Sequence, residues 1–121
     1  MDDQKREIIE ALETLVEYSP KLLKALKSIS EELRENRQPD TDEYIKTILK
    51  GMNWEIQIMN ATINYLNEEE ILIDKEKFNS ALIEFNTAFQ KNDDKVLADQ
   101  FETNILPLFE AFEKAAKRKI A

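Results

Sequence analysis

Apolar residues recur every three or four positions along four successive segments of the chain, and this periodicity limits the possible folds more than any other feature. The spacing is typical of amphipathic α-helices. The expected helices span residues 3–36, 41–69, 75–91 and 94–119. One glycine and three prolines leave little turn chemistry for a β-protein. We therefore expect an all-α fold, an antiparallel four-helix bundle that forms one domain over residues 1–121.

Two prolines fall inside expected helices. The apolar stripe of the first helix keeps its phase through Pro20, which favours one long helix kinked at that residue. The alternative is a break, with Ser19 as the N-cap of a second helix and Pro20 at its first position. Pro107 should likewise kink the fourth helix, or split it near Asn104.

Polar residues at the connections predict how two helices begin. Asp40 and Glu43 have the spacing of a capping box for the second helix. Asp74 is expected to cap the third helix, with Ile73 and Phe78 placed as a hydrophobic staple. Both features predict short, defined connections.

The second helix has two apolar faces. The main stripe consists of Ile45, Leu49, Met52, Ile56, Met59, Ile63 and Leu66. A second set, Trp54, Ile58, Ala61 and Tyr65, lies about 200° away round the helix. Another helix of the same chain or another chain must cover this second face. Gly51, the only glycine, lies within this helix and predicts a close helix crossing.

A row of amides separates these two faces. Its members are Asn53, Gln57, Asn60, Asn64 and Asn67. Three interpretations are open: a solvated face, a buried row that fixes helix register through hydrogen bonds, or the lining of a groove that binds a backbone or peptide.

The residue types present exclude most catalytic chemistry. The chain has no histidine and no cysteine, so zinc sites and the Glu-x-x-His di-iron pattern are not expected. A single glycine allows no phosphate-binding loop. We expect no cofactor and no metal.

Carboxylates are the remaining candidates for chemistry. Four-helix nucleotide pyrophosphohydrolases hold magnesium with inward-facing Glu-x-x-Glu pairs. Here Glu7, Glu10, Glu13 and Glu17 lie opposite the apolar stripe, and Asp99 and Glu102 flank Phe101. Both sets are therefore expected to face water.

Charge and hydropathy narrow the range of partners. The net charge of −8 should repel nucleic acid. No run of 18 apolar residues occurs, so no membrane partner is expected, and the N-terminus has no signal-peptide pattern. Cytoplasm is the expected location. The basic cluster at 114–119 is interpreted as stabilising a helix C-terminus.

These observations predict a non-catalytic helical protein–protein interaction module that binds a partner helix or self-associates, such as an adaptor, a small export-chaperone-like protein or a regulator. The candidate partner-binding residues are Trp54, Ile58, Tyr65, Asn53, Gln57, Asn60 and Asn64. Two alternatives are a magnesium-dependent all-α nucleotide pyrophosphohydrolase that uses carboxylates only, and a subunit of a larger bacterial or phage assembly.

Overall fold

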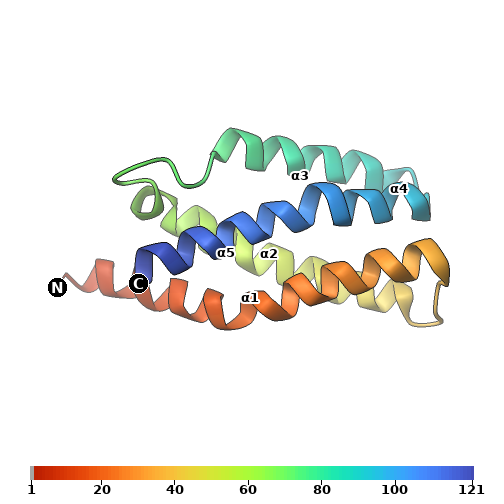
Figure 1. The fold of residues 1–121 in the computed structure, drawn as a ribbon, viewed down its shortest axis with the longest axis horizontal. Helices are drawn as coiled ribbons and strands as arrows, with labels where there is room; N and C mark the ends of the chain where they lie inside the picture. Colours follow the sequence, from red (N-terminus) through yellow and green to blue (C-terminus); the bar gives the residue numbers. More distant parts are fainter. Residues whose placement is uncertain (1) are drawn as a thin grey trace.

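The computed structural model describes residues 2–121, and 85% of the protein is helical. The elements are α1 (Asp3–Glu35), α2 (Thr41–Leu66), α3 (Lys75–Gln90), α4 (Asp94–Asp99), the π-helical turn η1 (Gln100–Ile105) and α5 (Leu106–Ile120). Because α4, η1 and α5 follow one another without a break, the described residues form four rods (Figure 1). Residues 2–121 contain no strand, which confirms the all-α prediction.

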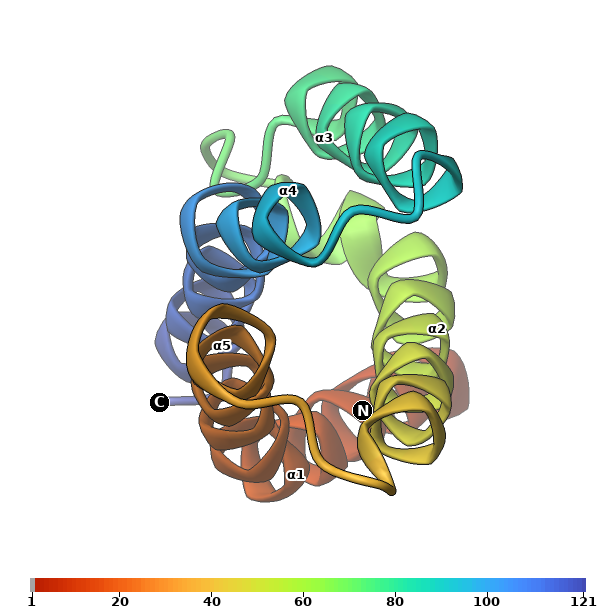
Figure 2. The same ribbon diagram turned by 90° about the vertical axis from the view of Figure 1, so that its right-hand side faces the viewer.

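The rods alternate in direction and surround a common core (Figures 1 and 2). Seen from the end, α1 and α3 lie at opposite corners, with α2 on one side and the α4–α5 rod on the other (Figure 2). α1 packs along both α2 and α5, whereas α3 packs mainly on α4 and η1. The largest fully buried side chains come from all four rods, and include Leu12, Met59, Phe78 and Phe109.

α1 continues through Pro20 without a break, as the unbroken phase of its apolar stripe predicts. Figure 1 shows this helix bent near its middle. Ser19 is fully buried inside the helix and does not act as a cap, so the alternative of two separate helices is wrong. Continuous packing of Leu15 and Leu22 against the core outweighs the backbone hydrogen bond that Pro20 cannot donate.

Replacing Pro20 with alanine should leave the free energy of unfolding unchanged or raise it by up to about 1 kcal/mol, because the N–H of residue 20 can then bond within the helix. Urea unfolding measures the change, with Lys21→Ala, also exposed on α1, as the control for helix propensity. A loss of more than about 1 kcal/mol would contradict this account and indicate that Pro20 stabilises the fold by restricting the unfolded chain.

The buried face of α2 is rotated from the predicted one. Leu49 and Ile56 are only half-buried. Ile48, Glu55 and Thr62 are buried instead, and at 100° per residue they lie between the two predicted apolar faces. The two faces are thus the edges of one broad buried arc on the side away from the amides. The apolar pattern misleads because polar side chains occupy the middle of that arc.

One of the two predicted caps forms. The carboxylate of Asp74 accepts the N–H of Lys77 at 3.2 Å, and Ile73 and Phe78 are both buried. The capping box of Asp40 and Glu43 is wrong, because Asp40 has φ −99° and ψ 9° and its side chain caps nothing. The buried Thr41 hydroxyl accepts the N–H of Gln38 at 2.7 Å, which holds the loop before α2 against the start of the helix.

A π-helical turn takes the place of the kink or split predicted near Pro107. The N–H of Leu106 bonds to the carbonyl of Phe101, five residues earlier. The buried residues Leu97, Phe101, Ile105 and Phe109 are spaced by four, which on a regular α-helix would drift by about 40° at each step. The wider turn keeps this row facing the core. Pro107 directly follows this turn, so the N–H that it cannot donate is missing where the helix changes from π to α geometry.

Ion pairs join the ends of the rods. Arg37 contacts Asp94 at 2.9 Å and Asp42 at 2.7 Å, which connects the α1–α2 loop to α4. At the other end of the bundle, Arg118 pairs with Glu70, and Lys119 lies 3.9 Å from Glu68. The basic C-terminal cluster therefore meets the acids that follow α2, in addition to its position at a helix C-terminus.

Candidate functional site

One face of α2 differs in chemistry from the rest of the surface. Between Lys50 and Glu68 the only charged residue is Glu55, and Glu55 is buried. We call the exposed residues of this stretch the α2 uncharged face: Asn53, Trp54, Gln57, Asn60, Ala61 and Asn64. At 1.5 Å per residue the stretch is roughly 25 Å long. A continuous uncharged face is unusual in a chain with 35% charged residues.

The structure excludes one of the three interpretations for four of the amides. Asn53, Gln57, Asn60 and Asn64 are exposed, so the buried alternative is wrong for them. Asn67 has another role. Its side-chain oxygen accepts the N–H groups of Leu72 and Ile73 at 2.9 and 3.0 Å, and its amide nitrogen donates to the carbonyl of Ile73 at 2.9 Å. Asn67 therefore shapes the loop that leads from α2 to α3.

The predicted aromatic candidates lie in different environments. Trp54 is 37% exposed and packs edge-on against Tyr18 of α1, with 5.1 Å between ring centroids. Ile58 is half-buried. Tyr65 is half-buried, and the amines of Lys119 and Lys5 lie 4.5 and 5.7 Å from its ring centroid. Trp54 therefore adjoins the exposed amides, whereas the ring of Tyr65 makes cation–π contacts with two lysines of the same chain.

Glu55 is the most unusual residue of the interior. Its side chain is 0% exposed, and neither carboxyl oxygen has a hydrogen-bond partner within residues 2–121. Burial, and to a smaller extent the negative charge of Glu113 on α5, together raise the pKa of Glu55 to about 8. The group is therefore a neutral carboxylic acid at pH 7, able to donate one hydrogen bond or release one proton.

The surroundings of Glu55 come from three helices. Glu113 is partly buried and lies 3.6 Å from Lys117 of its own helix. Burial, and then the charge of Glu55, raise the pKa of Tyr18. A Cβ atom at Gly51, one turn before Glu55, would lie 2.2 Å from the Tyr18 hydroxyl, which confirms the close helix approach predicted at the glycine. The glycine thus makes room for a tyrosine ring beside a buried acid.

The other carboxylates lie on the surface. Glu7, Glu10, Glu13 and Glu17 are exposed, as predicted. Asp99 and Glu102 are also exposed, and both pair with Arg34 of α1. Among residues 2–121 no three His, Cys, Asp or Glu side chains lie close enough together to hold a metal ion.

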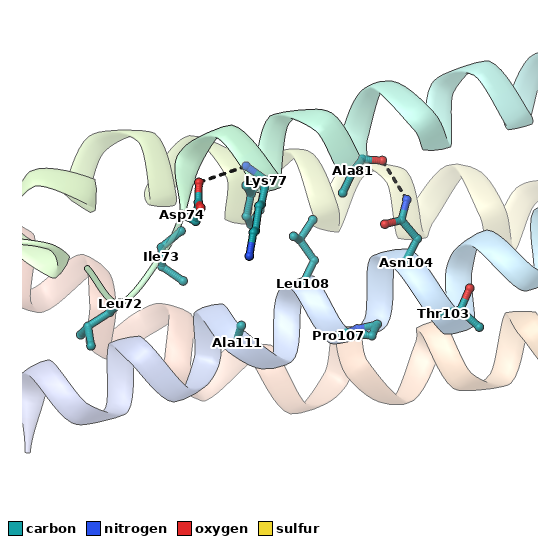
Figure 3. Close-up of a pocket in the computed structure, with 11 residues that line it drawn as sticks. Leu72, Ile73, Asp74, Lys77, Ala81, Thr103, Asn104, Pro107, Leu108 and Ala111 are labelled. Carbon is teal, nitrogen blue, oxygen red and sulfur yellow. Dashed lines mark hydrogen bonds between the residues drawn. The ribbon is translucent and has the colours of Figure 1, made fainter. Parts of the chain in front are cut away.

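A separate groove of about 380 Å³ lies where α3 diverges from α5 (Figure 3). Its lining is mostly apolar and includes Leu72, Phe78, Pro107 and Leu108. Asn104 of η1 donates to the carbonyl of Ala81 on α3 at 2.9 Å, and Figure 3 shows this bond between the two helices. The π-helical turn thus fixes the spacing between the two helices beside the groove.

Sequence reasoning missed Glu55, although a signal was present. It is the single charged residue between Lys50 and Glu68, and it follows Gly51 by one helical turn. An isolated acid in an otherwise uncharged stretch is a candidate for burial, because surface helices normally carry several charges. The ion pairs at the ends of the bundle, such as Arg37 with Asp94 and Arg118 with Glu70, had no comparable local pattern.

Comparisons with known proteins place the chain in a family. No helix among residues 2–121 has the length and apolar character needed to cross a membrane. Searches of curated proteins and of solved structures gave no match. Residues 10–115, which cover all or part of each helix, match the model of a family described as a domain of unknown function (DUF8042). The chain therefore belongs to the DUF8042 family.

Proposed function

We propose that this protein is a non-catalytic interaction module that presents the α2 uncharged face to a protein partner. The absence of exposed charge on this face carries the proposal. The centres of protein interfaces are depleted in Lys, Glu and Asp and enriched in aromatic residues, because charged groups lose hydration when they are covered. Trp54 supplies an exposed aromatic side chain at one edge of the face.

The position of the face supports the same function. α2 is held by α1 on its buried side, so its outer face can be covered without opening the core. Leu49 borders the face and lines a surface pocket with Phe89 of α3, an exposed aromatic residue. A partner helix on the amides would therefore meet apolar surface at its edges. The adaptor, chaperone-like or regulatory role and the cytoplasmic location stay predictions from the sequence.

Placing charge on this face should abolish partner binding without unfolding the protein. A photo-crosslinking amino acid at Asn60 reports on contact in the native cell, and the same probe at Lys27, exposed on α1, is the background control. Adding Gln57→Lys with Asn64→Lys should lower the yield of crosslinked product about tenfold or more, equivalent to at least about 1.4 kcal/mol of binding free energy.

A matched pair of asparagines on another helix serves as the control. Asn79 and Asn86 are exposed on α3 with the same seven-residue spacing as Gln57 and Asn64. Asn79→Lys with Asn86→Lys should leave both the crosslink yield and the melting temperature unchanged. Equal loss of crosslinking in the two double variants, or equal yields from the probes at Asn60 and Lys27, would refute the assignment of this face.

A further inference from the structure

We propose that the partner of the α2 uncharged face is the same face of a second copy of this chain, packed antiparallel across a two-fold axis. This proposal rests on the proposed function. In a two-fold interface a surface patch meets itself. A carboxylate or an ammonium in the centre of such a patch would face a like charge. A primary amide carries both a donor and an acceptor, so it complements its own kind.

The spacing of the amides fits this symmetry. Asn53, Gln57, Asn60 and Asn64 are separated by four, three and four residues, and they form a stripe along one side of α2. Reversing the helix about a point between Gln57 and Asn60 superimposes the stripe on itself. Gln57 of one copy then faces Asn60 of the other, and Asn53 faces Asn64.

The charges at the two ends of the face also favour the antiparallel arrangement. Lys46 and Lys50 precede the face, are exposed, and lie within about 50° of the amide stripe round the helix. Glu68 follows the face and is exposed. Antiparallel packing places Lys50 of one copy beside Glu68 of the other at both ends. Parallel packing would place like charges together.

The size of the face sets the expected strength of association. A stretch roughly 25 Å long on one helix offers less area than the ~800 Å² per partner of a standard stable interface. An amide stripe also contributes less than an apolar one. We therefore expect a weak, concentration-dependent dimer, which makes covalent trapping a better measurement than size alone.

Disulfide trapping tests the register directly, because the natural chain has no cysteine. Purified full-length Asn53→Cys and Asn64→Cys are mixed and oxidised. The two positions face each other in the proposed dimer, whereas like positions are offset by about 16 Å, beyond the reach of a disulfide. The mixture should give at least about fivefold more covalent dimer than either variant alone. Lys27→Cys, exposed on α1, gives the background from random collisions.

Exchanging the charges at the two ends of the face provides a second test of the register, in variants that leave the core and the amides unchanged. Lys50→Glu should lower the fraction of dimer in sedimentation at high protein concentration. Mixing Lys50→Glu with Glu68→Lys should restore it, because opposite charges then meet at both ends of a pair that contains one copy of each variant. Failure of the mixture to exceed Lys50→Glu alone would overturn the antiparallel register.

The outcomes separate this proposal from the one on which it rests. Crosslinking at Asn60 to a different protein in cells, with no trapping above the Lys27→Cys background, would leave the proposed function standing and overturn the second-copy partner. Absence of crosslinking at Asn60 in cells together with absence of trapping would overturn both. Trapping of Asn53→Cys with itself in preference to Asn64→Cys would contradict the antiparallel packing.

Discussion

Replacing Glu55 with glutamine should raise the free energy of unfolding by about 3 kcal/mol at pH 7, since each unit of pKa shift corresponds to ~1.4 kcal/mol. The pKa of Glu55 is about 8 in the folded protein, against an ordinary value of 4.5. At neutral pH the unfolded chain therefore gains free energy by ionising this group, and the folded chain does not. Glutamine has a similar shape and cannot ionise, so it removes this advantage of the unfolded state.

The pH dependence of this effect has a definite sign. Below about pH 4.5 the carboxyl is protonated in both states, and the natural protein has its full stability. As the pH rises towards 8, the unfolded state binds fewer protons and the stability contributed by the neutral acid is lost. The difference between Glu55→Gln and the natural protein should thus be small near pH 4.5 and largest near pH 8.

Urea unfolding at several pH values measures this difference. Glu17→Gln, an exposed carboxyl on α1, is the control and should change stability at pH 7 by less than about 0.5 kcal/mol. A Glu55→Gln variant that is no more stable than the natural protein at pH 8 would show that the ionised carboxyl is favourably accommodated in the interior.

Replacing Gly51 with leucine should lower the free energy of unfolding by about 3 kcal/mol, because the new side chain overlaps the ring of Tyr18. Even a Cβ atom would lie 2.2 Å from the Tyr18 hydroxyl and 3.3 Å from Cζ of the ring. Leucine is a better helix former than glycine, so the loss cannot come from helix propensity. Displacement of Tyr18 should also change the fluorescence of Trp54, which packs against it.

Two further variants distinguish overpacking from other effects. Lys50→Leu, at the neighbouring exposed position, should leave stability within about 0.5 kcal/mol of the natural protein. Combining Gly51→Leu with Tyr18→Ala should recover part of the loss, because it removes the ring that the leucine overlaps. Fully additive losses in the double variant would place the effect of Gly51→Leu elsewhere.

The helices could be predicted from the sequence because each one has its own periodic pattern. The stripe through Pro20 was a reliable sign of continuity, since a loop would have lost the phase. The rotation of the buried face of α2 was harder to predict from the sequence. Glu55 and Thr62 occupy the centre of its buried arc, and a pattern built on apolar residues alone assigns such positions to the surface.

The candidate site could be predicted in part. The amides at positions 53, 57, 60 and 64 stood out by their spacing, and their exposure follows from the position of the core. Tyr65 differs from Trp54 in its surroundings because the amines of Lys5 and Lys119 lie near its ring, and these two lysines come from opposite ends of the chain. Such contacts form only when the helices are packed together, so no local sequence pattern predicts them.

The neutral state of Glu55 changes how the folded chain exchanges protons with solvent. The formal net charge of −8 counts this carboxyl as ionised; with Glu55 neutral, the folded protein at pH 7 carries about −7. Folding at this pH is therefore accompanied by uptake of close to one proton from the buffer. The apparent enthalpy of unfolding then contains the heat of buffer protonation, and calorimetry in two buffers with different ionisation heats reads the protonation state of the interior directly.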